Sequence, residues 1–268
     1  SLAAAQAAGA DVRVVYSPLD ALAAAAAHPE KKVVFLAVGF ETTAPTEAAA
    51  VLAAQRQGLT NFFLLSAQKL VPPVMRALLD DPTAQVDGFL LPGHVAVVTG
   101  TRLFDFLAAD YHVPGVVGGF RPDEILRALH MLVRQLAAGE ARVENAYGSV
   151  VRPEGNPTAQ AAVDRVYEPA DTAWRGLGMI PASGLRMRAE YAAYDFAAVR
   201  PLGAIDVPDG RRGCRCGEVL RGKIVPKDCG LFGRSCVPEH AVGPCMVSVE
   251  GTCAAWYKYG AGRFRYGA

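Results

Sequence analysis

The chain has 268 residues, of which 51% are hydrophobic and 20% are charged. This balance is typical of a folded globular protein and excludes extensive disorder. Lys and Arg number 27 against 26 Asp and Glu, a net charge of +1, so neither nucleic acid nor an anionic membrane is expected as a partner. No apolar run approaches the ~20 residues of a membrane-spanning helix. The opening residues lack the pattern of a secretory signal, so we expect a cytoplasmic protein.

The first half of the chain alternates short β-branched runs with segments of helical pattern. Strands are predicted at residues 11–16, 33–38, 61–65, 86–91 and 115–117. Helices are predicted at residues 17–28, 46–57, 71–79, 95–109 and 122–139, the last with Ile125, Leu129, Leu132 and Leu136 on one face. Alternation of nearly continuous apolar strands with helices predicts a parallel sheet covered on both faces.

The second half of the chain does not continue this alternation of strands and helices. A short strand is predicted at residues 147–152 and a helix at 156–166, followed by turn-rich stretches at 174–178 and 181–184. Residues 201–213 are rich in Pro and Gly and predict a linker. We therefore predict an α/β protein: a parallel-sheet, Rossmann-like domain over 1–122, then a mixed domain over 123–268. The second domain contains the linker and a cysteine-rich region at 214–253.

Two loops at the ends of predicted strands carry polar side chains. The first contains Gly39, Glu41, Thr42 and Thr43, and the second contains Pro92, Gly93 and His94. In an open parallel sheet, ligands bind beyond the carboxyl ends of the strands, so both loops are expected on one rim. Backbone amides at a helix start can hold an anion, and an imidazole can bind metal or move protons.

Plainer roles remain open for these residues. Thr42 or Thr43 could serve only to cap the next helix, and Glu41 could be a solvated loop acid. A single loop histidine such as His94 is more often a surface residue than a metal ligand. The placement of both loops on one predicted edge favours the functional interpretation.

All six cysteines lie in one short stretch near the C-terminus. They are Cys214, Cys216, Cys229, Cys236, Cys245 and Cys253. Paired C-x-x-C knuckles of the usual zinc type are absent, whereas iron–sulfur clusters accept thiolates from separate loops. Four ligands would leave two cysteines for a redox pair. Cationic residues nearby, including Arg215, are expected to lower the pKa values of the thiols. Structural zinc is the main alternative, and three disulfides are a weaker one.

Seven motifs occur together in one order. They are GFETT (39–43), PGHV (92–95), GF-x-P-D (119–123), WRGLG (174–178), CRCGEVLRG (214–222), LFG-x-x-C-x-P (231–238) and CMVSVEGTCAAWYKY (245–259). With these motifs the chain closely resembles the HypD family of nickel–iron hydrogenase maturation factors, over essentially its whole length. No single motif would suffice, but the combination is highly specific.

The resemblance implies a scaffold and not an enzyme. With the small chaperone HypC, such a protein carries iron while it acquires two cyanides and one carbon monoxide, Fe(CN)2CO, the cyanides being delivered by HypE. It also implies a 4Fe–4S cluster held by Cys214, Cys229, Cys236 and Cys253, with Cys216 and Cys245 as a redox pair. The GFETT and PGHV loops would belong to the iron-assembly cleft, with His94 contacting iron.

The chain also departs from the family pattern. Family members begin with roughly another hundred residues, which include a cysteine proposed to bind iron and a C-P-x-C dithiol, whereas here no cysteine precedes Cys214. We therefore expect the chain to be a fragment of a longer product. Two other functions stay open: a cluster-dependent disulfide reductase that uses Cys216 and Cys245, and a zinc-stabilised interaction module.

Overall fold

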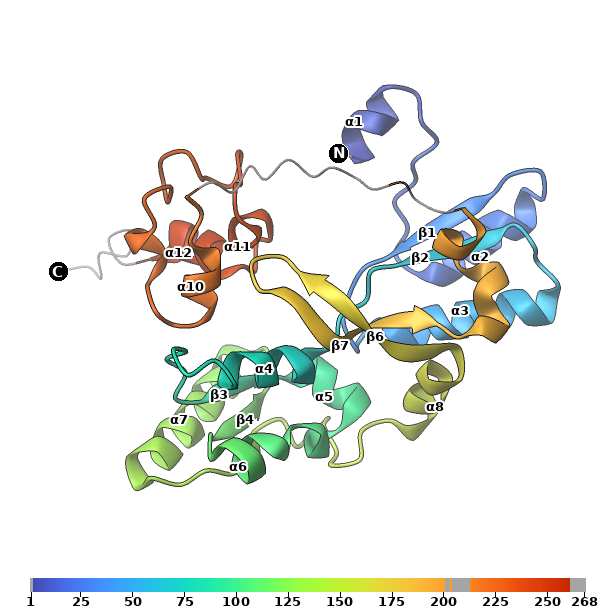
Figure 1. The fold of residues 1–268 in the computed structure, drawn as a ribbon. Coiled ribbons are helices and arrows are strands. Elements are labelled where there is room, and N and C mark those ends of the chain that lie inside the picture. The colour runs from blue at the N-terminus through green and yellow to red at the C-terminus, as the bar shows by residue number, and fades with distance from the viewer. Residues whose placement is uncertain (1, 201–202, 204–212, 261–268) are drawn as a thin grey trace. The chain divides into compact units, whose positions relative to one another are not determined.

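The computed structural model describes residues 2–200, 203 and 213–260 (Figure 1). It confirms a mixed α/β fold with parallel sheets and a cysteine-rich C-terminal region. The described chain forms two compact units, each built from three stretches: unit 1 comprises 1–69, 156–169 and 185–202, and unit 2 comprises 70–155, 170–184 and 203–268. The predicted domains 1–122 and 123–268 differ from these units because the chain passes between the units several times. The predicted linker at 201–213 lies almost wholly outside the described residues.

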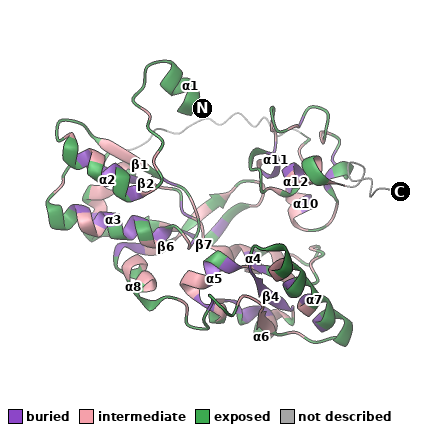
Figure 2. Cartoon of the chain, turned by 180° about the vertical axis from the view of Figure 1, so that it is seen from behind, coloured by how far each residue is buried: buried purple, intermediate pink, exposed green. Residues whose placement is uncertain are grey.

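Unit 1 is organised around a two-stranded parallel sheet. Its elements are α1 (Leu2–Ala7), α2 (Pro18–Ala27), β1 (Val33–Ala37), α3 (Ala44–Gln57), β2 (Phe62–Ser66), α8 (Pro157–Val166), the 3-10 helix η2 (Ala189–Tyr194) and α9 (Phe196–Val199). Strand β1 pairs with β2 in register Val33 to Phe62. The buried core includes Leu22, Val51, Phe62 and Leu64, and β2 is buried along its first three residues (Figure 2).

The α/β part of unit 2 has a three-stranded parallel sheet of order β3-β4-β5. Its elements are α4 (Val71–Leu79), β3 (Phe89–Pro92), α5 (Gly93–Thr99), η1 (Thr101–Phe104), α6 (Phe106–Tyr111), β4 (Gly115–Gly118), α7 (Pro122–Ala138) and β5 (Val143–Asn145). Strand β4 is buried throughout, as expected for the central strand of a parallel sheet.

The cysteine module completes unit 2. We use this name for residues 213–260, whose elements are α10 (Cys216–Leu220), η3 (Pro226–Asp228), α11 (Pro244–Val247) and α12 (Thr252–Tyr259). A two-stranded sheet of β6 (Tyr167–Trp174) and β7 (Gly178–Met187) has residues in both units. No helix in the described ranges is both long and apolar enough to span a membrane.

Most predicted elements of the first half are confirmed, and two are wrong. Residues 11–16 form no strand: Val14 is 85% exposed and Tyr16 is 99% exposed, and without a neighbouring strand to complete its hydrogen bonds the β pattern is not realised. The predicted helix 95–109 breaks at Gly100, whose φ of +84° ends α5. The short helix η1 follows Gly100 directly, and α6 begins after Asp105.

Three predictions for later segments are also wrong. The third strand of the unit 2 sheet is β5, whereas 147–152 form turns and coil. The stretches predicted as turn-rich are mainly the strands β6 and β7, and only residues 175–177 turn. In α7 the buried residues are Ala128, Leu132 and Gln135, while Leu129 and Leu136 are each more than 40% exposed. The face against β4 therefore differs from the predicted apolar face.

Candidate functional site: a cysteine pocket and two strand-end loops

The loop that follows β1 rests on a buried polar network. Gln68, which follows β2, donates from Nε2 to Thr43 Oγ1 at 2.8 Å and to Glu47 Oε1 at 2.6 Å. The Thr43 hydroxyl donates to the Phe40 carbonyl at 3.3 Å, so it fixes the loop and makes no side-chain cap for α3. Gly39 is required here because a Cβ at this position would collide with Thr43 Oγ1. These bonds fix the GFETT loop to the first turn of α3.

Burial has changed the acid–base character of this network. Glu47 and Gln68 are each only 2% exposed, and desolvation raises the pKa of Glu47 from 4.5 to about 7. The Tyr167 hydroxyl is buried beside Glu47, and burial together with the Glu47 charge raises its pKa. Glu41 is also buried, at 7% exposure, which overturns its interpretation as a solvated loop acid. Thr42 is half-buried and Thr43 is exposed.

The second loop presents an accessible imidazole. His94 is exposed and follows Pro92 and Gly93 at the start of α5. Its ring stacks on Phe120, with ring centroids 3.8 Å apart and an interplanar angle of 26°. Glu124 Oε2 accepts hydrogen bonds from the backbone amides of Phe120, at 2.9 Å, and Arg121, at 3.0 Å. The GF-x-P-D motif thus starts α7 and holds the aromatic ring on which His94 rests.

The prediction that one sheet edge carries both loops is wrong. Strand β1 pairs only with β2 in unit 1, and β3 pairs with β4 in unit 2. Gly39, Glu41, Thr42 and Thr43 therefore end one sheet, while Pro92, Gly93 and His94 end another. The reason is that the chain begins a second sheet after Lys69 in place of adding a third strand to the first. Membership of a common assembly cleft stays a prediction.

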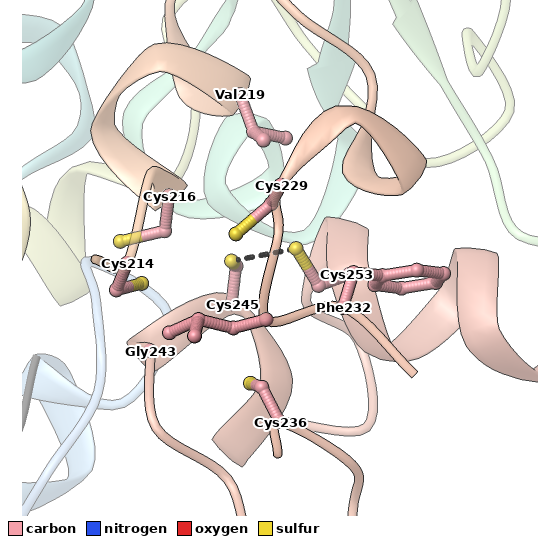
Figure 3. Close-up of a pocket in the computed structure, with 10 residues that line it drawn as sticks. Cys214, Cys216, Val219, Cys229, Phe232, Cys236, Gly243, Cys245 and Cys253 are labelled. Carbon is pink, nitrogen blue, oxygen red and sulfur yellow. Dashed lines mark hydrogen bonds between the residues drawn. The ribbon is translucent and has the colours of Figure 1, made fainter. Parts of the chain in front are cut away.

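The six cysteines line one pocket in the cysteine module (Figure 3). Cys214 precedes α10 and Cys216 begins it, Cys229 follows η3, Cys236 lies in a loop, and Cys245 and Cys253 lie on α11 and α12. All six are free, five are buried and Cys214 is half-buried. The wall of the pocket also contains apolar side chains, among them Val219, Leu231 and Phe232. Short elements from four parts of the module therefore bring the sulfurs together.

The thiol contacts inside the pocket are close. Cys245 Sγ and Cys253 Sγ are 3.0 Å apart, and the Val242 amide donates to Cys236 Sγ at 3.4 Å. In Figure 3 the sulfurs of Cys229, Cys245 and Cys253 gather at the centre of the pocket. The 3.0 Å contact joins a predicted redox cysteine to a predicted cluster ligand, so the division of four ligands and two redox cysteines stays a prediction.

The expectation that cationic neighbours lower the thiol pKa values is wrong for two of the six cysteines. Burial raises the pKa of Cys214 to about 11 and also raises the pKa of Cys253. Arg215 Nε is 2.8 Å from Glu218 Oε1, and Arg221 Nε is 2.8 Å from Asp81 Oδ2. Both guanidinium groups are therefore paired with carboxylates. The raised pKa values favour the protonated form of these two thiols until a ligand replaces their protons.

The donor set of the pocket contains sulfur and no carboxylate or imidazole. Soft thiolate ligands favour iron–sulfur clusters, zinc or copper(I) over hard cations, and four thiolates are what a 4Fe–4S cluster requires. The residues present therefore fit such a cluster. Among the described residues, no group of three or more His, Cys, Asp or Glu side chains is arranged to hold a single metal ion.

Sequence reasoning found all six cysteines and both loops but missed the network beneath the first loop. Glu47 has the position of an ordinary acidic residue in the first turn of a helix, and Gln68 follows a strand without any motif. The available signal was the spacing of Glu47, which lies three residues after Ala44 and four before Val51 and therefore on the same side of α3 as these apolar residues.

Comparison with known proteins defines the class. A family model described as "HypD: Hydrogenase formation hypA family" matches residues 1–260. The chain is 47% identical over 267 residues to the hydrogenase maturation factor HypD of Rhodobacter capsulatus, covering 98% of this chain and 71% of that protein. It is 46% identical over 261 residues to HypD of Escherichia coli K12, covering 97% of this chain and 69% of the relative.

HypD of Cupriavidus necator is 44% identical, with 97% of this chain and 70% of the relative covered. The α/β fold, the cysteine pocket and these relatives together define a hydrogenase maturation factor. The chain belongs to the HypD family.

Proposed function

We propose that this protein acts as a scaffold for assembling the Fe(CN)2CO group of nickel–iron hydrogenases, together with HypC-like and HypE-like partners, and that it is not itself an enzyme. The observation that carries the proposal is the pocket in which all six cysteines of a HypD-family chain meet. Free thiols in this number suit a reducing compartment, so we place the protein in the cytoplasm. The near-neutral charge gives no reason to add nucleic acid or membrane as a partner.

In this proposal the cysteine pocket holds a 4Fe–4S cluster through Cys214, Cys229, Cys236 and Cys253, and Cys216 and Cys245 form the redox pair. A bound cluster supplies single electrons to chemistry beside it. The protein's own contribution is to exclude water with apolar residues such as Phe232 and to provide an N–H donor to Cys236. Hydrogen bonds to sulfur and burial are the usual means of tuning cluster potential.

The iron that receives cyanide and carbon monoxide is the cargo of the scaffold. We assign its site to the GFETT and PGHV loops, with Gly39, Glu41, Thr42 and Thr43 on one and Pro92, Gly93 and His94 on the other. Support comes from the accessible imidazole of His94 and from the rigid placement of the first loop by Gln68. A neutral imidazole nitrogen is a good iron ligand, and its ring is oriented by stacking on Phe120.

Metal analysis of anaerobically purified protein tests the cluster. We expect about four iron and four sulfide per chain and a brown protein with broad visible absorption. Cys236→Ser should lose this iron, whereas Cys216→Ser, at an equally buried position, should keep it. Stoichiometric zinc without iron or sulfide would contradict the proposal and identify a zinc-stabilised interaction module.

A substitution of His94 tests the cargo site. In the whole maturation protein, supplied with its HypC-like and HypE-like partners, His94→Ala should remove the infrared bands of iron-bound cyanide and leave the cluster colour unchanged. The matched control is His130→Ala, which changes a different exposed histidine, located on α7. Equal cyanide bands in His94→Ala and the parent protein would exclude His94 as an iron contact.

The pocket also supports one second candidate, a cluster-dependent disulfide reductase that uses Cys216 and Cys245, because both cysteines lie in its wall beside the proposed cluster ligands. Such an enzyme would reduce the disulfide of a thioredoxin-like substrate, and turnover should be lost in Cys216→Ser. Failure of the parent protein to reduce such a substrate, with its cluster intact and an electron donor present, would eliminate this candidate.

A further inference from the structure

The turn that joins β6 to β7 lies directly on one of the six thiols. Residues 175–177 form this turn, which is closed by a hydrogen bond from the Leu177 amide to the Trp174 carbonyl at 3.0 Å. Gly176 has a φ of +92°, and a Cβ added to it would lie 2.9 Å from Cys216 Sγ. The turn therefore leaves no room for a side chain between Gly176 and the Cys216 sulfur, and Cys216 is only 4% exposed.

Gly217 at the start of α10 also lies very close to the turn. A Cβ added to Gly217, the residue after Cys216, would lie 2.6 Å from the Gly176 carbonyl oxygen. The obstructing atom belongs to the backbone, so a change of rotamer would not relieve the clash that a side chain at Gly217 would introduce. Glycine at both positions lets the turn and the start of α10 approach closely, so the turn covers the buried Cys216 thiol on this side.

The hairpin beneath the turn is firmly held. Ser183 is fully buried, and its hydroxyl accepts a hydrogen bond from Trp174 Nε1 and donates one to the Ile180 carbonyl, both at 2.8 Å. Asp171 Oδ1 accepts from the Ala182 amide at 2.9 Å. The turn therefore stands on an ordered support, and uncovering Cys216 requires the turn and α10 to separate.

We propose that this turn is a cover that controls when Cys216 reacts with a disulfide on a partner molecule, and that Gly176 and Gly217 are positioning residues for that thiol. The proposal rests on the proposed function in so far as Cys216 belongs to the redox pair. In the reaction the Cys216 sulfur attacks one sulfur of the partner's disulfide and a mixed disulfide forms. The partner's other sulfur leaves and takes up the proton that Cys216 gave up, as a thiol.

Gly217→Ala gives the direct test. Alanine is tolerated at this helical position, but its Cβ must push the turn away from α10. The reduced protein is treated at one fixed pH with dithiodipyridine, and the mixed disulfide at Cys216 is followed by peptide mass analysis. We expect the rate at Cys216 to rise about tenfold, because exposure of a covered thiol is limited by local opening. Gly230→Ala is the matched control, since no atom would lie within 4 Å of its Cβ.

A second pair of variants distinguishes displacement of the turn from Cys216 from the backbone strain of alanine at a positive φ. Gly176→Ala and Gly178→Ala place alanine at φ values of +92° and +88° in the same hairpin, but only the first meets Cys216. We expect a faster Cys216 reaction in Gly176→Ala alone. Equal rates in both, or no change in Gly217→Ala relative to Gly230→Ala, would overturn the proposal. Iron and sulfide are measured in the same samples, so failure of the cluster assignment is seen separately from failure of the cover.

Discussion

The first α/β unit and the cysteine module have cores of different composition. The hydrophobic core of unit 1 consists of aliphatic and aromatic side chains from β1, β2 and the surrounding helices, and it lies in the same unit as the buried polar pair Glu47 and Gln68. The core of the module is made largely of the cysteines themselves, with Val219, Met246 and Ala254. The first interior is packed mainly with hydrocarbon side chains, whereas we expect the second to depend on what its sulfurs bind. Stability in unit 1 should follow packing, and stability in the module should follow metal chemistry.

The largest expected effect is on the module. Cys229→Ser removes a proposed cluster ligand from a buried position, and a small domain organised around a metal centre unfolds when the centre is lost. We expect amides in residues 213–260 to lose nearly all protection from hydrogen exchange, while those of β1 and β2 keep theirs. A module that stays protected in Cys229→Ser without iron would show that its core suffices alone.

A core substitution in unit 1 should have the next largest effect. Phe62 is fully buried on β2, and Phe62→Ala should lower the free energy of unfolding by about 3–5 kcal/mol. Hydrogen exchange of β1 and β2 amides measures this loss locally. Leu36→Ala on the paired strand changes a side chain that is 42% exposed and should cost about 0.5 kcal/mol or less. Similar losses in the two variants would contradict the assigned core.

The buried Glu47 should make the stability of unit 1 depend on pH. Its pKa is raised from 4.5 to about 7 in the folded state, so the folded state favours the protonated carboxyl. Stability is therefore full below pH 4.5 and falls as pH rises through about 7, by up to about 3 kcal/mol. Glu47→Gln should remove this fall, as measured by urea unfolding between pH 5 and 8. Glu190→Gln, at an exposed position in the same unit, should retain it, and a fall that persists in Glu47→Gln would exclude this carboxyl as its source.

The smallest effect is expected for the ion pair that joins the module to the rest of unit 2. Arg221 lies 2.8 Å from Asp81, and a backbone hydrogen bond from Gln85 to the Arg221 carbonyl reinforces the contact. Asp81→Asn should slightly increase hydrogen exchange in residues 213–260, by much less than Cys229→Ser. Asp110→Asn removes an ion pair of the same length, to Arg76, and should leave the module unchanged. Partly exposed pairs contribute little, and less at high salt.

Local signals in the sequence predicted most helices of the fold. Ser17 and Asp20 form the capping box expected at the start of α2, and Gly139 ends α7 in the left-handed conformation. Strand pairing was less predictable, because it depends on partners distant in sequence. Residues 11–16 have a strand pattern but no partner, and the separation of β1 and β3 into two sheets leaves no mark in either strand.

The candidate site was likewise only partly predictable from the sequence. The cysteines were identifiable because their residue type and clustering are rare, and the structure brings all six to one pocket. The roles of Glu47 and Gln68 depend on burial, for which the sequence offers only the helical spacing of Glu47 from apolar residues of α3 and no signal at Gln68. Likewise the contact of Gly176 with Cys216 joins residues 40 positions apart, and the WRGLG motif alone gives no indication of it.

The interleaved path of the chain has a consequence for dissecting the gene. Each compact unit is assembled from three stretches that alternate along the polypeptide, so a single cut at any junction between stretches leaves at least one unit incomplete. Truncation series and domain swaps at such borders should give insoluble products. Internal deletions that join 69 to 156 and 169 to 185 are the rational way to ask whether unit 1 folds independently.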